Sequence, residues 1–229
     1  LVDSGVSVTN VPSIASEYRA NPSAGFSIVS YSSASNAVTV AHGLNAAPKL
    51  IIVKDRNNAN DWVVITTLLA NTTDYLVLNS SAASANFGVD APTSTTFIPS
   101  QSSSSDYVAY CFAPVEGYSA FGKWKGNASV NGPFVYTGFK PSFILLKGAD
   151  ATHYWAMHDD ARDPVNTGDK QYLWANDSGQ EYNGFDVDFL ANGFKLRNSN
   201  GNWNTTGYGN DTYIYAAFAS HPFKTARAS

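Results

Sequence analysis

The sequence of 229 residues is poor in charge, in glutamate and in sulfur. Charged residues make up 14% of it, whereas about a quarter is usual. Of the 18 acidic residues 15 are Asp, although a surface built on helices normally carries more Glu, Lys and Arg. Their place is taken by Ser, Thr, Asn and aromatic residues, which are typical of strands and turns. We therefore expect an all-β protein.

Further absences exclude whole classes of function. A single cysteine, Cys111, allows neither an internal disulfide nor a Cys-rich metal site. The formal net charge is 14 − 18 = −4, so there is no basic excess for binding nucleic acid. The longest apolar runs, such as residues 50–53 and 143–146, are far shorter than a membrane span. With 44% hydrophobic residues the chain can still bury a core, so we expect a folded protein that does not insert into a membrane.

The chain contains two copies of one pattern. Pro48 and the apolar run after it correspond to Pro141 and the run after that, and residues 106–113 correspond to 212–219. The offset between the copies grows from 92 (25 to 117) to 106 (106 to 212), which indicates loop insertions in the second copy. The sequence therefore predicts three parts, namely an N-terminal segment or linker (1–24), a first repeat (25–114) and a second repeat (115–229).

Each copy contains short strand candidates separated by Gly, Asn, Asp and Ser clusters. They are 26–31, 37–40, 49–54, 62–66, 75–78, 96–99 and 106–112 in the first copy, and 134–136, 142–147, 154–157, 171–175, 194–197 and 212–218 in the second. This spacing predicts two tandem, homologous antiparallel β-sandwich units of jelly-roll-like type. A short helical turn at 12–18 is the best helix candidate.

Alternation in residues 106–112 fixes the faces of that strand. Val108, Tyr110 and Phe112 lie on one face and Tyr107, Ala109 and Cys111 on the other. Because both faces are apolar, we expect a central strand that is covered on both sides. Cys111 is then a small buried residue rather than a catalytic thiol.

The densest polar cluster comprises His158, Asp159, Asp160, Arg162 and Asp163. Imidazole and carboxylates suit a metal or acid–base site. The first copy has Thr-Thr-Leu at the equivalent place, so the cluster is not part of the shared pattern, and an Asp-rich turn is the favoured interpretation.

Two other polar features stand at turns or strands. Asp186 and Asp188 alternate, which puts both carboxylates on one face where they could hold Ca²⁺, but the first copy has Asp90 alone. His42 precedes a glycine and is interpreted as a hydrogen-bonded loop histidine. No nucleotide-binding, zinc-protease or serine-hydrolase motif is present, so we expect no catalytic residues and, apart from that Ca²⁺ hypothesis, no cofactor.

The tryptophans divide into two groups. Trp62 and Trp155 occupy matching positions and are expected in the core or on a sheet face, whereas Trp124, Trp174 and Trp203 have no partner Trp in the other copy. Trp203 lies in a polar, glycine-rich loop, where an exposed ring among amides would suit a sugar, although it could equally pack against its own domain. The candidate glycan or receptor contacts are therefore Trp203, Tyr208, Asn202, Trp174 and Trp124.

Several stretches resemble a repeat domain of tailed-bacteriophage virion proteins, of the tail-fibre type found in phages of marine and cyanobacterial hosts. They are Gly-Phe-Ser-Ile-Val-Ser-Tyr at 25–31, the run from His42 to Arg56, Tyr-Val-Ala-Tyr-Cys-Phe-Ala-Pro-Val-Glu-Gly-Tyr-Ser at 107–119, Gly-Pro-Phe-Val-Tyr-Thr-Gly-Phe-Lys-Pro-Ser-Phe-Ile-Leu-Leu-Lys at 132–147 and the ending at 218–228. The resemblance spans residues 25–228 and implies a virion structural protein, external on the particle and on its tail, that contacts host-surface receptors or glycans. A homotrimer that contacts other virion proteins is what this type of protein implies.

We therefore predict a non-enzymatic tail-fibre or spike component. The alternative is a capsid decoration or head-fibre protein. A third alternative is a polysaccharide depolymerase, which would need two carboxylates roughly 5–10 Å apart, with Glu116, Asp159, Asp160 and Asp188 as candidates. Since residue 1 is Leu and the one methionine is Met157, we also expect a processed chain or part of a longer one.

Overall fold

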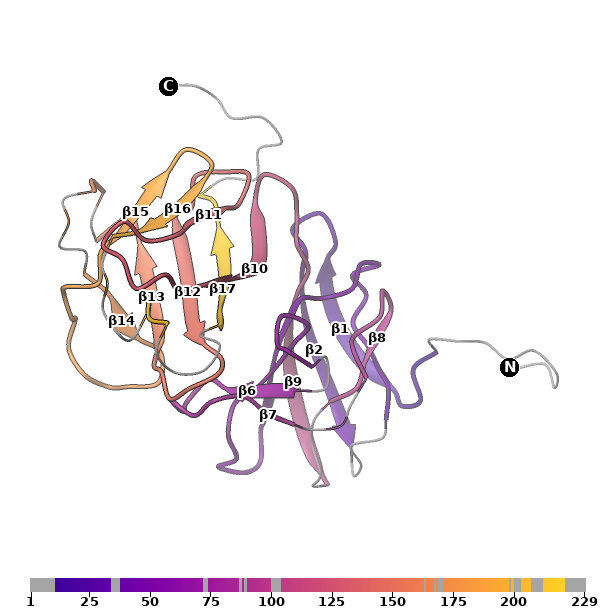
Figure 1. Ribbon diagram of the computed structural model, residues 1–229. Helices are drawn as coiled ribbons and strands as arrows, with labels where there is room; N and C mark the ends of the chain where they lie inside the picture. The colour runs from indigo at the N-terminus through magenta and orange to yellow at the C-terminus, as the bar shows by residue number, and fades with distance from the viewer. Residues whose placement is uncertain are drawn as a thin grey trace.

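The computed structural model describes residues 11–33, 38–71, 74–86, 88, 90–99, 104–162, 164–166, 168, 171–197, 199, 203–206 and 212–220. Over these residues the protein is all-β with antiparallel pairing and no helix, which confirms the predicted fold class (Figure 1). The strands are β1 (Ser16–Asn21), β2 (Phe26–Ser33), β3 (Val40–Ala41), β4 (Leu50–Asp55), β5 (Val63–Thr66), β6 (Asp74–Val77), β7 (Ala85–Asn86), β8 (Thr96–Phe97), β9 (Ser105–Phe112), β10 (Ser119–Lys125), β11 (Phe134–Tyr136), β12 (Phe143–Gly148), β13 (Trp155–Asp159), β14 (Leu173–Trp174), β15 (Val187–Leu190), β16 (Gly193–Leu196) and β17 (Thr212–Phe218).

Two large sheets repeat one strand order. The first is β1-β2-β9-β4-β5-β6-β7 and the second is β10-β17-β12-β13-β14. Under the sequence alignment of the two copies, β2-β9-β4-β5-β6 corresponds strand for strand to the whole second sheet. Each large sheet has a small companion, β3-β8 in the first half and β11-β16-β15 in the second.

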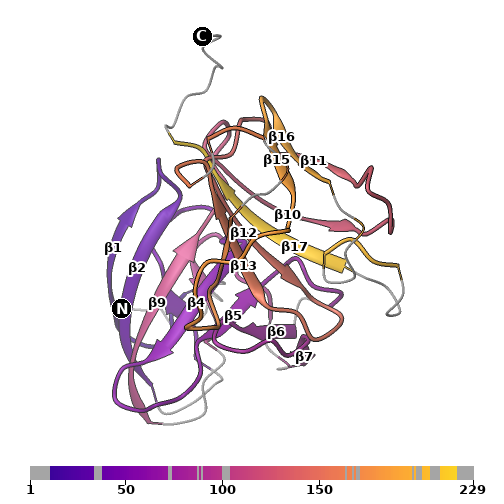
Figure 2. The same cartoon turned by 90° about the vertical axis from the view of Figure 1, so that its left-hand side faces the viewer.

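Three buried clusters hold these layers together. One lies on the β3-β8 side of the first sheet and includes Val53 and Phe97, and another lies between the second sheet and β11-β16-β15. The third is built from both halves, with Leu50 and Val64 from the first sheet and Trp155 and Ile214 from the second. The two large sheets thus pack against each other through a common core, and Figure 2 shows the two sheets next to one another. Because of this shared core, the division into two tandem units at residue 114 stays a prediction.

The centre of the first sheet follows the predicted alternation. β9 lies between β2 and β4, and its residues Tyr107, Ala109 and Cys111 are fully buried on one side. Phe112, on the other side, packs against the cluster shared with the second half. The predicted central position of this strand is confirmed, and Cys111 is a buried thiol, but the face that carries Val108, Tyr110 and Phe112 is only half-buried.

Four strands were not predicted. The residues expected in a linker or a helical turn form β1, which pairs along its whole length with β2. The reason is the turn at 21–25, where Asn21 Oδ1 accepts hydrogen bonds from the Ser23 hydroxyl (2.7 Å) and the Ala24 amide (3.2 Å), and Gly25 has φ 64°. This turn returns the chain as a hairpin. The others are β7, β10 and β15.

Backbone and side-chain hydrogen bonds join the halves. The Lys147 side chain is completely buried, and its Nζ donates to the carbonyls of Gly148 (2.8 Å), His153 (2.8 Å) and, from the first half, Ser81 (3.2 Å). The His153 amide also donates to the Ser81 carbonyl, at 2.9 Å. Burial lowers the pKa of Lys147 to about 7.

Candidate functional site

Trp203 is not the exposed aromatic that its polar neighbours predicted. Its side chain is 1% exposed and is stacked between Phe185, at a centroid distance of 4.9 Å, and Trp174, at 5.6 Å. The polar neighbour Asn204 turns inward instead of facing water, since its Oδ1 accepts from the Asn127 amide and its Nδ2 donates to the Ser129 carbonyl, both at 2.7 Å. These two hydrogen bonds hold the loop so that the Trp203 ring lies inside the core.

Trp124 is also a core residue, since it is 7% exposed and stacks on Tyr213 at 5.1 Å. Both rings are buried and neither offers a face to a ligand, so the structure does not support them as glycan or receptor contacts. Asn202 and Tyr208 lie outside the described residues. Trp174 differs from the two buried tryptophans because it is half-buried and lies at the end of the stack that starts at Phe185 and runs through Trp203.

Trp174 belongs to a group of rings that reaches the surface, which we call the aromatic platform (Tyr154, Trp174 and Tyr182). Tyr154 is 45% exposed, and its ring centroid lies 5.0 Å from that of Trp174, while the Tyr182 centroid lies 5.8 Å from it. β13 and β14 pair through Ala156 and Trp174, which places Tyr154, just before β13, beside Trp174. Tyr182 is held by its bridge with Tyr172. Strand pairing therefore assembles the platform from three separate segments.

A hollow of about 480 Å³ adjoins the platform at Tyr182. Its volume is within the range of roughly 300–1,000 Å³ that small-molecule sites occupy. Amides can both donate and accept hydrogen bonds, so the lining suits a ligand rich in hydroxyl groups. The lining residues are Gln171, Gln180, Glu181, Tyr182 and Asn183.

Ion pairs and a hydrogen bond hold the residues at the edge of the hollow, which we call its rim, in place. Arg162 Nε lies 2.7 Å from Glu181 and Arg162 Nη1 lies 3.4 Å from Asp159. The Tyr182 hydroxyl donates to Asp177 Oδ2 at 3.0 Å, and this hydrogen bond, together with burial, raises the pKa of Tyr182. Tyr182 therefore stays a protonated phenol at neutral pH, and its ring is held in one orientation.

The polar cluster begins in the last two residues of β13 and continues into a turn, as its sequence favoured. Asp159 Oδ1 accepts hydrogen bonds from the backbone amides of residues 161 and 162, at 3.1 and 2.9 Å. Asp160 accepts from the Ser142 hydroxyl at 2.6 Å, and His158 is buried against Phe185 at 4.7 Å. Asp163 lies outside the described residues. The carboxylates of this cluster are thus used to shape the loop.

The Asp186 and Asp188 pair is arranged differently from the Ca²⁺ hypothesis. Asp188 forms an ion pair with Arg197 Nε, so one of its oxygens already has a partner. Within the residues that the structure describes, no group of three or more His, Cys, Asp or Glu side chains is placed to hold a metal ion. The Ca²⁺ site stays a prediction, and the geometry adds no third ligand to it.

No helix in the described part of the chain is long and apolar enough to cross a membrane.

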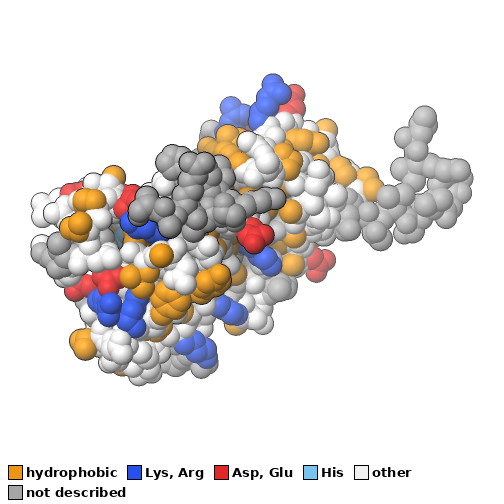
Figure 3. Space-filling view, turned by 90° about the horizontal axis from the view of Figure 1, so that it is seen from above, with side chains coloured by type: hydrophobic (Ala, Val, Ile, Leu, Met, Phe, Trp, Pro, Cys, Tyr) orange, Lys and Arg blue, Asp and Glu red, His pale blue; other side chains and the backbone are white. Residues whose placement is uncertain are grey.

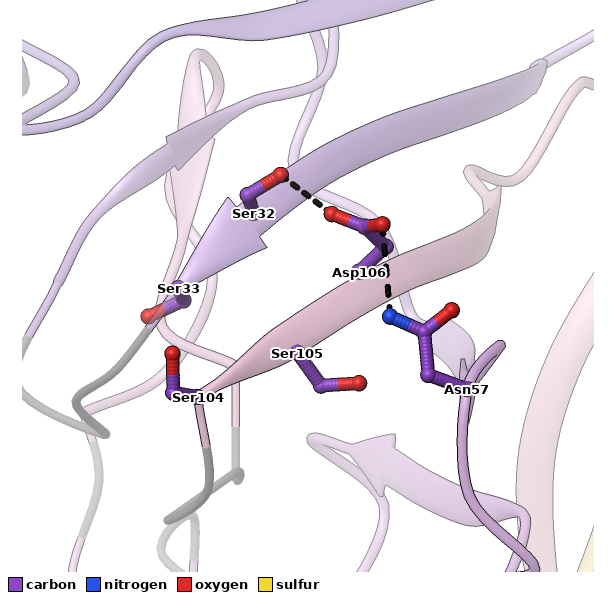
Figure 4. Close-up of a pocket in the computed structure, with 6 residues that line it drawn as sticks. All are labelled: Ser32, Ser33, Asn57, Ser104, Ser105 and Asp106. Carbon is purple, nitrogen blue, oxygen red and sulfur yellow. Dashed lines mark hydrogen bonds between the residues drawn. The ribbon is translucent and has the colours of Figure 1, made fainter.

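A second hollow lies at the end of the β2–β9 pair in the first half (Figure 4). It has a volume of about 420 Å³ and contains the Asp106 carboxylate, which accepts from the Ser32 hydroxyl at 2.6 Å and from Asn57 Nδ2 at 3.3 Å. These hydrogen bonds hold the pKa of Asp106 below its usual value. The other lining residues are Ser33, Ser104 and Ser105. None of the described residues that line this hollow is aromatic, so they offer no stacking surface.

Below that hollow, Asp55 is almost completely buried and saturated with hydrogen bonds. Burial alone would raise the pKa of its carboxyl, but the bonds from Ser105 (2.5 Å), Asn58 and the amides of residues 57 and 58 outweigh burial and hold the pKa well below its usual value. Asn60 Nδ2 donates to the second oxygen at 2.8 Å. This carboxylate anchors the loop after β4 and is not free for a ligand.

His42 is the hydrogen-bonded loop histidine that its sequence context predicted. It is completely buried, its Nε2 lies 3.3 Å from the Thr93 carbonyl, and its Nδ1 accepts from the Leu44 amide at 3.2 Å. Burial lowers the pKa of His42, so its ring is neutral at pH 7.

Sequence reasoning found Trp174 but missed Tyr154 and Tyr182. A signal for Tyr154 was present, because it is the first residue of the predicted strand 154–157 and its partner in the first copy is Asp61 rather than an aromatic. The contact of Tyr182 with Trp174 depends on the bridge between Tyr172 and Tyr182, and no local sequence pattern predicts it.

Residues 2–222 match the profile of a family described as a domain of unknown function, DUF7483. No curated protein and no solved structure matches the chain. Because the match spans nearly all of the sequence, the protein belongs to the DUF7483 family.

Proposed function

We propose that this protein is a non-enzymatic component of a phage virion, of the tail-fibre or spike type, and that it attaches to glycans on the host surface through the aromatic platform. The resemblance of residues 25–228 to virion repeat domains supports the setting on the particle. The observation that carries glycan binding is the juxtaposition of Tyr154, Trp174 and Tyr182 with the amide-lined hollow of about 480 Å³.

The chemistry of a sugar ring explains this choice. One face of a pyranose presents C–H groups, which pack on the negative face of an aromatic ring, and its edge presents hydroxyls, which need donors and acceptors. The platform supplies the rings, and Gln171, Gln180 and Asn183 supply amides at its side. The stack through Trp203 to Phe185 supports Trp174 from behind, so little ordering of the binding surface is needed.

Charged residues make up only 14% of the chain, and on the face seen in Figure 3 the Lys, Arg, Asp and Glu side chains lie in small groups separated by other side chains. This composition suits a ligand that is bound mainly through hydrogen bonds and stacking.

Binding is tested with the full chain on an array of bacterial surface polysaccharides and oligosaccharides, followed by titration calorimetry on the strongest ligand. We expect Tyr154→Ala and Gln180→Ala each to weaken affinity at least about tenfold, which corresponds to about 1.4 kcal/mol. Tyr136→Ala is the matched control, since Tyr136 is also a tyrosine of the second half and is 67% exposed on β11, outside the platform. Absence of glycan binding, or equal loss in the control, would contradict the proposal.

The place on the particle is tested separately by immuno-electron microscopy of the phage with antibodies against this chain. We expect label at the tail. Label spread over the capsid would contradict the tail assignment and favour a decoration protein, and it would leave the glycan measurements unaffected.

A further inference from the structure

We infer that the aromatic platform and its hollow select glycans by charge, accepting uncharged or amino-bearing sugars and rejecting sugars that carry carboxylate, sulfate or phosphate groups. This inference rests on the proposed function and adds to it the chemical class of the ligand.

The first observation is the local charge balance. Among the residues that the structure describes there, Glu181 lines the hollow, Arg162 pairs with Glu181 and Asp159, and Asp177 accepts from Tyr182, so these four charged groups sum to 1 − 3 = −2. Of the described lining residues, Glu181 alone is charged. An anionic sugar placed there would meet like charge, and like-charge juxtaposition is an effective way of excluding a wrong partner.

The second observation is that the guanidinium already faces two carboxylates of the protein. Arg162 Nε lies 2.7 Å from Glu181, and Nη1 of the same group lies 3.4 Å from Asp159. Recognition of a carboxylate, sulfate or phosphate normally uses a guanidinium that can offer two parallel N–H donors. An anionic sugar that bound Arg162 in this way would share the guanidinium with Glu181 and Asp159 and would lie close to both negative charges.

The third observation concerns the acceptors. Tyr182 donates its hydroxyl to Asp177 Oδ2 at 3.0 Å, so this carboxylate is held in place beside the ring. Each carboxylate oxygen has two lone pairs, which leaves acceptor sites for a sugar hydroxyl or an ammonium group. The aromatic faces carry negative potential and likewise favour C–H groups and cations over anions.

The rings form a surface and not a cage. Centroid distances of 5.0 Å for Tyr154–Trp174 and 5.8 Å for Trp174–Tyr182 are those of rings in direct contact. A quaternary ammonium cage needs rings that are separated around the cation. The platform therefore accommodates the flat face of a sugar, and an amino group on that sugar would bind at the carboxylates of the rim.

The test reads an array of neutral, amino-bearing and acidic oligosaccharides at two ionic strengths. The Debye length is about 30 Å at 0.01 M salt and about 8 Å at 0.15 M, so repulsion between the rim and an acidic sugar is strongest in the dilute buffer. We expect neutral sugars to bind equally in both buffers and amino-bearing sugars to bind more strongly in dilute buffer. We expect acidic sugars to bind at least about tenfold more weakly than neutral ones in dilute buffer and to recover partly with salt.

A charge variant makes the test specific. Glu181→Lys changes the sum of local charges from −2 to 0, and we expect it to strengthen binding of acidic oligosaccharides by about an order of magnitude at low salt. Glu17→Lys on β1 is the control, because it changes the net charge of the whole chain equally but lies in the first sheet. Equal binding of acidic and neutral sugars by the unmodified protein in dilute buffer, or equal effects of the two variants, would overturn the charge selection while leaving glycan binding in place. If no glycan binds at all, the proposed function fails, and this inference fails with it.

Discussion

Trp155 Nε1 donates a hydrogen bond of 2.8 Å to the backbone carbonyl of Val77, so a core side chain of the second half is tied to the main chain of the first. The indole is 2% exposed and lies in the cluster that both large sheets share. The hydrogen bond of a buried donor to a half-buried strand residue therefore depends on the two halves staying together.

Trp155→Phe keeps an aromatic ring but removes the donor, which leaves the Val77 carbonyl without this partner. We expect the free energy of unfolding to fall by about 1–3 kcal/mol, in a single cooperative transition. Urea denaturation followed by far-ultraviolet circular dichroism measures this. Trp62→Phe is the control and should cost less, since Trp62 is half-exposed and stacks on Tyr110 at the surface. Two separate transitions, with the variant affecting one of them, would contradict the shared core.

Because of Lys147, the free energy of unfolding should rise with pH. Its folded pKa of about 7 lies below the unfolded value of about 10.4, so between these values the unfolded chain binds more protons than the folded one. Relative to Lys147→Met, the unmodified protein should gain stability as the pH rises from 7 to 10, by up to about 1.4 kcal/mol per pH unit. Below pH 7 both states carry the charge, and the difference between the two proteins should be constant.

Urea midpoints of both proteins at pH 6, 7, 8, 9 and 10 provide the measurement. Tyrosines with raised pKa values, such as Tyr172 and Tyr215, are present in both proteins and cancel in the difference. A difference that does not change between pH 7 and pH 10 would contradict the assigned pKa.

The repeat in the sequence has equivalent contacts in the structure. Asn79 and Asn176 occupy matching positions, and each accepts the amide of the matching tryptophan, Trp62 at 2.9 Å and Trp155 at 2.8 Å. Such contacts join neighbouring strands, and the alternation of apolar and polar residues fixes neighbouring strands. The expected core of β9 was correct for the same reason.

The misplaced tryptophan shows where local patterns fail. Trp203 has polar neighbours, which predicted exposure, but its ring contacts Phe185 and Trp174, at separations of 18 and 29 residues along the chain (203 − 185 and 203 − 174). Burial of a large ring contributes more free energy than local polarity opposes. The aromatic platform was missed in part for a related reason, since its rings come from three segments that only the fold brings together.

Cys111 should be unreactive in the folded protein. The thiol is completely buried in β9, and burial raises its pKa, so the reactive thiolate is scarce. We expect Ellman's reagent to label less than a tenth of the protein over an hour in native buffer at pH 8, and about one thiol per chain in guanidinium chloride. Rapid stoichiometric labelling without denaturant would contradict the position of this strand in the core.

Asp55 should make the first half sensitive to acid. Hydrogen bonds from Ser105 and the 57–58 loop hold its folded pKa below the unfolded value of about 3.9, so the folded state favours the carboxylate. The stabilisation is fully present above pH 5 and should be lost as the pH falls through 4 toward the folded pKa, because the unfolded chain then takes up the proton first. Asp55→Asn removes the titrating group and accepts fewer of these hydrogen bonds, so the variant should be less stable than the unmodified protein at pH 7. The difference in stability between the two proteins should become smaller between pH 5 and pH 2.

Thermal unfolding at pH 7, 5, 4, 3 and 2 measures this difference, which is the gap between the two proteins, and Asp61→Asn, at an exposed loop position, serves as the control. A gap that stays constant down to pH 2 would show that the Asp55 carboxylate is not selectively stabilised in the folded state.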